Sequence, residues 1–436
     1  MALGGGTFLA QNKELPGAYV NFVSKTAASG RLSERGIATM PLELDWGVSG
    51  EIFEVTSWEF RENSREIFGY EYESDKLKGL RDLFLNANTL YGYRLNGEGK
   101  KAGNAFAQAL YSGVRGNDLK ISIQINADNE SLFDVKTILG TVVVDEQTVS
   151  AADELTANKY VRWKDGIVLE ATAAAPLTGG ENGEVSGADY QAYLDKIESY
   201  TFHTMGAAVT DDTTKALFAA FVKRMRDEMG VKFQLVLYDY AKADYMGVIS
   251  VNNKTLDEGF GEAGLVYWVT GASCGCAVNK SNQNKKYDGN FKVDTPYTQN
   301  QLKAAIREGK FTFHKVGTDI RVLEDINTMV TTLETIGAAF RENQTVRVID
   351  QIGNDIAVLF NTKYLGVVPN DAAGRISLWS DIVKHHEQLQ AIRAIENFSD
   401  ADVTVEQGDT KKSVVVSDFV TVVNAMSQLY MVCTVA

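Results

Sequence analysis

The sequence has little cysteine and little histidine, and this excludes several kinds of site. Of the 436 residues, only 3 are cysteine and 4 are histidine. Cys274, Cys276 and Cys433 form neither an even set for a disulfide framework nor a pair of clusters that would complete a metal site. Cys274-Gly275-Cys276 also lacks the two-residue spacing of a redox CxxC motif. We therefore expect no metal, no cofactor, and a tightly packed helix of small residues at this position.

Basic charge and long apolar runs are also scarce. The chain carries 57 acidic and 43 basic residues, a formal net charge of −14 and a pI near 4.9. An acidic chain opposes phosphate binding, so we expect no direct contact with nucleic acid. No apolar run approaches the ~20 residues of a membrane helix, and no basic and then apolar N-terminus marks a signal peptide. We expect no membrane insertion and synthesis in a cytoplasm.

The chain contains ordinary globular material, with 44% hydrophobic and 23% charged residues. Strand and helix patterns alternate along most of it, which predicts α/β architecture with a parallel sheet. The predicted strands are 36–44, 90–95, 200–204, 232–238, 246–251 and 320–323, and the predicted helices are 75–86, 212–229, 262–278 and 299–308.

Two other regions differ from this pattern. Residues 103–180 contain short β runs without a long helix, which predicts a small antiparallel barrel or sandwich inserted into the α/β domain. From about residue 325 the pattern becomes mainly helical, with helices over 326–341, 346–360 and 377–397. In the second of these helices Arg347 and Asp350 are three apart, so we expect a weak local ion pair. His386 in the third is expected to be a packing histidine.

No catalytic constellation emerges from the motifs. Gly259-Phe260-Gly261-Glu262-Ala263-Gly264 formally fits a dinucleotide fingerprint, but it does not follow a strand directly and lacks an acidic ribose ligand ~20 residues later. Ser273 lacks the flanking glycines of a nucleophile elbow, and none of the four histidines precedes such an elbow. We therefore expect that the protein is not an enzyme.

Both chain ends have the pattern of unpaired strands. Residues 1–24 are glycine-rich and then strand-like, and the last residues are uncharged with strong β propensity. Such an edge is a template for adding to another chain's sheet, which predicts polymerisation. The predicted inter-subunit arm residues are Tyr19, Val20, Phe22 and Val23 at one end, and Leu429, Tyr430, Met431, Val432, Cys433 and Val435 at the other.

Several segments, in the same order along the chain, carry a resemblance to a known family. They are Leu15-Pro16-Gly17-Ala18-Tyr19-Val20, Tyr111-Ser112-Gly113-Val114-Arg115-Gly116-Asn117-Asp118-Leu119, Leu177-Thr178-Gly179-Gly180 with Gly183, Arg347-Val348-Ile349-Asp350 with Tyr364-Leu365-Gly366, and Asn370 through Gly374-Arg375 to Asp402-Val403. In these segments the chain resembles contractile-tail sheath proteins, a family that includes the sheaths of contractile phages, defective prophages and R-type bacteriocins.

The resemblance implies an α/β and α+β multidomain protein. It implies a subtilisin-like domain (25–102 and 181–324), an outer β-rich domain (103–180), and a C-terminal assembly domain (325–436) that carries terminal arms, with the N-terminal arm at 1–24. It also implies hexameric rings stacked into a helical sheath around a tail tube, with baseplate and tail terminator proteins as further partners. The sheath would be part of a virion tail assembled in the bacterial cytoplasm, and would contract to drive the tube through a cell envelope.

Two questions stay open from the sequence. Basic exposure in the C-terminal domain suggests Lys363, Lys384, His385 and Arg393 as tube-facing residues. An ordinary solvated helix face is the alternative, and it is favoured because Asp381 and Glu387 lie on the same helix and dilute the positive charge. The alternatives to a sheath are a subtilisin-like hydrolase and a non-contractile virion structural protein.

Overall fold

The computed structural model describes residues 32–332, 334 and 336–435, and these fold into two compact units. The larger unit contains residues 34–351 and 423–435, and the smaller unit contains residues 32–33 and 352–422. Helix α8 (Asn343–Leu359) contributes to both units. The predicted arm residues Tyr19, Val20, Phe22 and Val23 lie outside the described residues.

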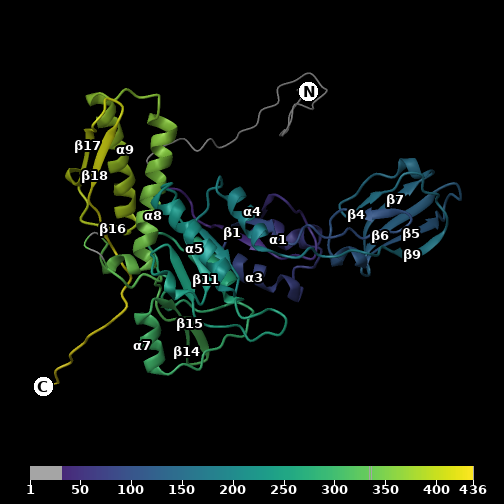
Figure 1. Cartoon of the computed structure of the whole chain (residues 1–436), viewed down its shortest axis with the longest axis horizontal. Helices are drawn as coiled ribbons and strands as arrows, with labels where there is room; N and C mark the ends of the chain where they lie inside the picture. Colours follow the sequence, from purple (N-terminus) through teal and green to yellow (C-terminus); the bar gives the residue numbers. More distant parts are fainter. Residues whose placement is uncertain (1–31, 333, 335, 436) are drawn as a thin grey trace. The chain divides into compact units, whose positions relative to one another are not determined.

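A seven-stranded sheet is the framework of the larger unit (Figure 1). In sheet order the strands are β13 (Lys310–Phe311), β12 (Val248–Val251), β11 (Gln234–Tyr238), β10 (Thr204–Ala207), β1 (Ile37–Leu42), β3 (Thr89–Arg94) and β2 (Ile52–Thr56). All neighbours pair in parallel except β2, which pairs antiparallel with β3 at one edge. Nearly every residue of the central strand β1 is buried, as expected for a parallel strand covered on both faces.

Helices cover both faces of this sheet. Val236 of β11 packs in the core with α3 (Lys78–Phe84) and α6 (Leu265–Gly275), whereas its neighbours Leu235 and Leu237 pack in the core with α4 (Gly187–Ile197) and α5 (Asp212–Asp227). The alternation follows from the period of two along a strand. α6 approaches α3 so closely that a Cβ on Gly271 would lie 2.2 Å from the carbonyl oxygen of Leu83. Cys274 is fully buried in α6, which confirms the predicted packing of small residues.

Two predicted strands of the sheet need correction. The strand expected at 200–204 begins only at Thr204. The segment expected at 320–323 does not extend the parallel sheet. It forms β15 (Asp319–Val322), which pairs antiparallel with β14 (Phe313–Val316) because Gly317, with a φ of 61°, turns the chain back at once. α7 (Gln299–Arg307) lies before β13 as predicted.

The segment between β3 and α4 forms two small antiparallel sheets around one core, in agreement with the prediction. One sheet has the order β7-β6-β5-β9 and the other pairs β4 with β8. Their strands are β4 (Ala107–Ala109), β5 (Leu119–Ile125), β6 (Phe133–Leu139), β7 (Val142–Val149), β8 (Val161–Trp163) and β9 (Thr172–Pro176). Trp46, from the segment after β1, joins this core and makes an edge contact with Tyr111 at 5.2 Å.

The helix predicted over 326–341 is wrong. Within the described part of this segment the chain is irregular apart from a short 3₁₀ turn, Ala338–Arg341. Asn327 donates from its amide to the carbonyl of Phe340, and the hydroxyl of Thr328 donates to the carbonyl of Tyr245. Such side-chain bonds to the backbone compete with a helical ladder. Together with a bond from the backbone of Thr328 to the carbonyl of Val248, they attach the segment to the start of β12.

The first half of α8 is attached to the larger unit by two buried ion pairs. Arg347 pairs with Asp325 at 2.8 Å, and Asp350 accepts two bonds from Arg226 at 2.6 and 2.7 Å. The predicted local pair between Arg347 and Asp350 is therefore wrong, because each residue has a partner far along the chain. Burial alone would raise the pKa of Asp325, but Arg347 and nearby donors hold it below its ordinary value.

The smaller unit is an α+β arrangement around helix α9 (Ala372–Ala391). A π-helical turn, Phe360–Tyr364, ends α8, and Asp371 caps α9 by accepting from the backbone of Gly374 at 2.8 Å. Two antiparallel pairs complete the unit: β17 (Val403–Gln407) with β18 (Val414–Asp418), and β16 (Ile395–Glu396) with β19 (Thr421–Val422). β17 lies against α9 (Figure 1). α9 occupies most of the predicted range 377–397, but it ends at Ala391, and Ile392 beyond its end is exposed.

Candidate assembly interface

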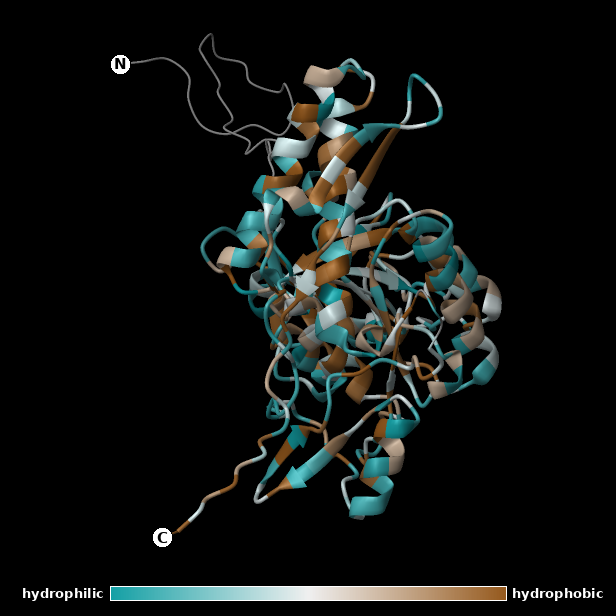
Figure 2. Ribbon diagram, turned by 90° about the vertical axis from the view of Figure 1, so that its left-hand side faces the viewer, coloured by the Kyte–Doolittle hydropathy of each residue, from teal (hydrophilic) through white to brown (hydrophobic). Residues whose placement is uncertain are grey.

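The C-terminal tail, residues 423–435, contains no helix or strand of its own. It is an extended segment rich in hydrophobic residues (Figure 2). Leu429, Tyr430 and Val432 are 86%, 87% and 94% exposed. The sequence identified this apolar run, and the structure gives it no partner strand among the described residues. Apolar side chains with open backbone groups form a surface suited to pairing with another chain.

The root of this tail is fixed by the first turn of α8. The amide of Gln344 donates to the carbonyl of Val423 at 3.0 Å, and its oxygen accepts from the backbone of Ala425 at 2.9 Å. Thr345 and Asn424 are also hydrogen-bonded, at 3.2 Å. The sequence reasoning missed these anchors, because a glutamine at a helix start gives no signal about a partner some eighty residues away.

The β17–β18 hairpin has two open outer edges among the described residues. Its inner face packs on α9, where the indole of Trp379 donates to the carbonyl of Val403 at 3.0 Å. Its other side is exposed, including Val415 at 53% and Phe419 at 67%. A two-stranded sheet is marginal by itself, and further strands would extend its ladder. The sequence reasoning did not locate this hairpin, although Asp402-Val403, where it begins, lies in one of the segments that carry the family resemblance.

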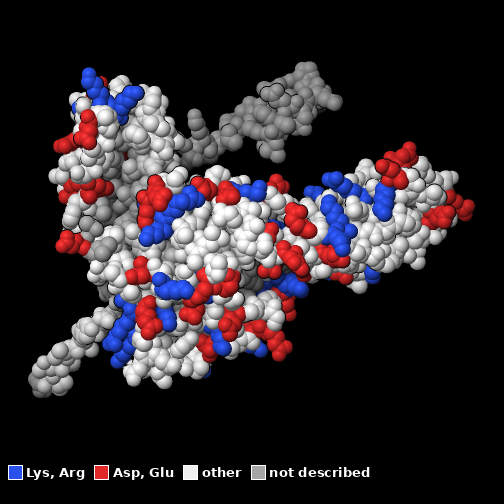
Figure 3. Space-filling model, in the orientation of Figure 1, with Lys and Arg blue, Asp and Glu red and all other residues white. Residues whose placement is uncertain are grey.

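The structure separates the four residues expected to face a tube. His385 is 1% exposed and its Nε2 lies 2.9 Å from Asp355, so it has no surface to offer and this expectation is wrong. Lys363 is half-exposed and paired with Asp381, whose hydrogen bond raises the pKa of the lysine. Lys384 and Arg393 are exposed. The face in Figure 3 carries interspersed acidic and basic side chains.

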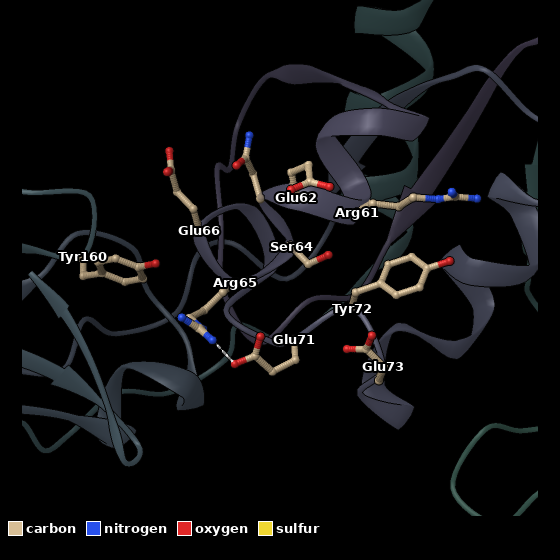
Figure 4. Close-up of a pocket in the computed structure, with 10 residues that line it drawn as sticks. Arg61, Glu62, Ser64, Arg65, Glu66, Glu71, Tyr72, Glu73 and Tyr160 are labelled. Carbon is tan, nitrogen blue, oxygen red and sulfur yellow. Dashed lines mark hydrogen bonds and ion pairs between the residues drawn. The ribbon is translucent and has the colours of Figure 1, made fainter.

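A polar hollow of about 660 Å³ lies beside α1 (Ser57–Glu62) and α2 (Ser64–Phe68). Figure 4 shows Glu66, Glu71 and Arg65 around it, with Arg65 paired to Glu71. Ser64 is not activated as a nucleophile, because its hydroxyl donates to the carbonyl of Phe60. The hollow therefore has the charges of a solvated surface and no catalytic pairing.

A second hollow, of about 790 Å³, lies at the carboxyl ends of β1 and β10. Ligands of α/β proteins often bind at such a point, where the strand order reverses. Its lining includes Gly259 of the glycine-rich loop together with Glu43, Asp75 and Glu258. These carboxylates oppose a phosphate, and β12 ends at Val251, well before the loop. The charges lining this hollow therefore do not favour a phosphate group beside the glycine-rich loop.

The described residues hold no group of three or more histidine, cysteine or acidic side chains arranged for a metal ion. Within the same residues, no helix is long and apolar enough to cross a membrane. The exposed tail and the open edges of the β17–β18 hairpin are further candidates for a functional surface among the described residues.

Four family models match successive parts of the chain. Residues 35–95 match the tail sheath protein Gp18 domain III N-terminal region, and residues 96–182 match the phage tail sheath protein beta-sandwich domain. Residues 183–328 match the phage tail sheath protein central domain, and residues 335–436 match the phage tail sheath C-terminal domain.

Individual proteins are similar over nearly the whole length. The phage-like element PBSX protein XkdK of Bacillus subtilis is 32% identical over 98% of this chain and 99% of the relative. The crystal structure of a sheath tail protein from Desulfitobacterium hafniense is 35% identical, with a TM-score of 0.82 over 94% of this chain and 98% of that chain. The helical sheath of the anti-feeding prophage in its contracted state shares the fold at 12% identity, with a TM-score of 0.59 over 97% of this chain and 99% of that chain.

Proposed function

The chain belongs to the phage tail sheath protein family and is a structural component of a contractile tail rather than an enzyme, and from this premise we propose how it assembles. Copies form hexameric rings that stack helically around an inner tube. Contraction then moves each copy to a larger radius and drives the tube through a cell envelope. Baseplate and tail terminator proteins bound the polymer at its two ends, and the assembly forms in the bacterial cytoplasm as part of a virion tail.

The exposed C-terminal tail carries this proposal. Residues 429–435 are apolar, exposed and without secondary structure, while their root at residues 423–425 is anchored to α8. We assign the tail to the open edge of the β17–β18 hairpin in an adjacent copy, where it adds a strand. Tyr19, Val20, Phe22 and Val23 of the N-terminal arm pair in the same way with another neighbour.

The proposed role of each domain follows the arrangement that the family resemblance implies. Residues 25–102 and 181–324 form a domain of subtilisin-like topology, a reading supported by a mainly parallel sheet with helices on both faces. Residues 103–180 form an outer β domain, and residues 325–436 form the inner assembly domain. Lys384 and Arg393, with Lys363 as a weaker candidate, face the tube through surface contacts that are screened by salt.

Contraction needs no nucleotide under this proposal. Each backbone hydrogen bond in an added strand contributes about 0.5–1.5 kcal/mol net, so a tail of several residues holds its neighbour throughout the movement. The free energy of contraction comes from the difference between two sets of side-chain contacts, multiplied over many copies.

A proline scan of the tail tests the strand pairing. Tyr430→Pro, Met431→Pro, Val432→Pro and Cys433→Pro are made one at a time in the full chain. In a strand paired along one edge, only alternate residues donate to the partner, so cylinder formation in negative-stain microscopy should fail at every second position. Ser427→Pro, which precedes the predicted strand, is the matched control and should still assemble.

Other outcomes would contradict the proposed pairing. Equal tolerance at all four positions would show that the tail does not add a strand, and equal loss at all four would indicate apolar contact without a ladder. Deleting residues 1–24 tests the other arm, and cylinders formed by that truncated chain would refute its role.

A further inference from the structure

Arg347 in the larger unit has buried donor groups that no described residue accepts. The side chain is 1% exposed, and its Nη2 donates to Asp325 at 2.8 Å and to the carbonyl of Lys280 at 3.1 Å. Nε and Nη1 have no hydrogen-bond partner among the described residues. A guanidinium carries five N–H groups, so three of the five stay unused here. Because a buried charged donor without an acceptor is strongly destabilising, this side chain requires a further acceptor.

A second guanidinium, which the described residues bond only through carbonyl oxygens, lies close to Arg347. Arg35 donates from Nε to the carbonyl of Cys276 at 3.0 Å and from Nη2 to the carbonyl of Ser273 at 3.2 Å. These carbonyls lie at the end of α6, whose dipole offers only about half of a negative charge. Burial and the nearby charge of Arg347 lower the pKa of Arg35 to about 10. The hydroxyl of Ser273 is also buried and finds no partner in the described part of the chain, so positive charge and open donors gather at this helix end.

The neighbouring carboxylates, Asp325 and Asp350, are already bonded to other donors. One oxygen of Asp325 accepts from Arg347, and the other accepts from the amide of Asn343 at 3.0 Å. Asp350 accepts with both oxygens from Arg226. The acceptor for the unused N–H groups of Arg347 therefore has to come from elsewhere, and the surrounding positive charge favours an acceptor that is negative.

We propose that a small inorganic anion, of the size of chloride, binds at the unpartnered nitrogens of Arg347 and is held there by the second charge of Arg35. The anion accepts hydrogen bonds from the guanidinium and supplies the negative charge that the carbonyls of α6 lack. A water molecule accepts hydrogen bonds as well, but it carries no charge and leaves the two guanidinium groups repelling each other. The almost complete burial of Arg347 restricts the site to a small ion.

The anion joins parts of the larger unit that are far apart in the sequence. Arg35 stands just before β1, Cys276 follows α6, and Arg347 lies in the first half of α8. The unfolded chain does not bring these residues together, so the anion binds the folded unit and stabilises it by mass action. For a Kd of about 10 mM, 100 mM chloride lowers the unfolding constant by about tenfold.

The first experiment compares unfolding of the full chain by urea in sodium chloride and in sodium gluconate. Equal ionic strength keeps the screening of surface charges the same in both salts, and gluconate is too large for the site. Replacing gluconate with chloride should lower the unfolding constant of the larger unit by about tenfold, and sodium bromide should act like chloride. Equal unfolding constants in chloride and gluconate would overturn the proposal.

Variants then locate the effect. Arg347→Lys keeps a positive charge beside Asp325 but removes Nε and Nη1, so the difference between chloride and gluconate should disappear. Arg224→Lys, at the exposed pair with Glu198, is the matched control and should keep it. Should Arg347→Lys fail to fold, Arg35→Gln keeps an amide donor for a carbonyl of α6 and removes the second charge, so it should weaken the chloride effect. A chloride effect of wild-type size in the variant that folds would overturn this placement of the site.

The second experiment locates the ion directly. Crystals of the full chain grown in sodium bromide should show an anomalous scattering peak within hydrogen-bond distance of Nε or Nη1 of Arg347. Bromide peaks at surface side chains alone would indicate an adventitious ion only, and ordered water without an anomalous signal at Arg347 would show that water is the acceptor. Either of these results would refute the anion site.

Discussion

Replacing Asp350 with alanine should destabilise the larger unit by about 3–5 kcal/mol, because it leaves a buried guanidinium without its carboxylate. Arg226 and Asp350 are 1% and 7% exposed and joined by two bonds of 2.6 and 2.7 Å. Burial acts to lower the pKa of Arg226, and Asp350 more than offsets this, so the pKa is raised. Without Asp350, the bond to the carbonyl of Phe233 remains, while Nε already lacks a partner among the described residues.

Helix α5, which carries Arg226, also supplies a matched control. Arg224 makes the same kind of two-pronged contact with Glu198, at 2.6 and 3.3 Å, but these side chains are 41% and 33% exposed. Glu198→Ala should therefore cost about 0–1 kcal/mol. The double variant Arg226→Met with Asp350→Leu removes both charges and should recover most of the loss, since no unpaired charge stays buried.

Urea unfolding of the full chain, followed by tryptophan fluorescence, measures these differences. Trp46, Trp58, Trp163 and Trp268 lie in the larger unit, so the signal reports mainly on it. A loss for Asp350→Ala within about 1 kcal/mol of that for Glu198→Ala would refute the reasoning, because burial would then make no difference to the pair.

Three further predictions concern pH, the tube and the outer domain. Burial, with Glu324 and Asp325 nearby, raises the pKa of Glu342 to about 6, so the stability it contributes below its ordinary pKa is lost as the pH rises through about 6. Glu342→Gln should raise the urea midpoint at pH 8 but not at pH 4, unlike the exposed control Glu98→Gln, and an unchanged midpoint at pH 8 would contradict this. The double variant Lys384→Glu with Arg393→Glu should lose co-sedimentation with tube protein at low salt while the control Lys303→Glu keeps it, and retention by both would remove these residues as the tube contact. Replacing residues 103–180 with a short Gly/Ser linker, together with Trp46→Gln to avoid an exposed indole, should leave cylinder formation intact, and a folded variant that fails to assemble would show that this domain takes part in assembly.

Hydrophobic periodicity predicted most helices and strands well, but it did not predict which side chains pair with one another across the fold. The buried runs at β1 and β11 and the amphipathic pattern of α5 were sufficient to predict strand, helix and parallel sheet. The partner of Asp350 is 124 residues away, and a local pattern had no means of finding it, so the prediction chose Arg347 three residues away. The helix expected at 326–341 failed for a related reason, because bonds from Asn327 and Thr328 to distant carbonyls decide that conformation.

The candidate site was only partly accessible from the sequence. The apolar, uncharged tail was identified by composition, because an apolar run with strand propensity at a chain end is suited to contact with another chain when it stays exposed. His385 was placed on the surface as one of several basic residues of the C-terminal domain, but both adjacent histidines are buried beside carboxylates from α8 and β18. A polar residue facing the core shows its partner only when the chain is folded.

The positions of the paired buried charges and of the exposed, unpaired strand edges indicate which contacts can change during contraction. The buried charges of Arg226 and Arg347 are paired within the larger unit, and breaking either pair would cost about 3–5 kcal/mol. The tail and the hairpin edges have exposed apolar side chains and no partner strand among the described residues. A transition that refolded the larger unit would have to break the first kind of contact, whereas one that exchanges surface contacts between copies changes only terms of about 1 kcal/mol at a time. The second route has far smaller barriers, so we expect the larger unit to keep its internal structure while its contacts with neighbouring copies change.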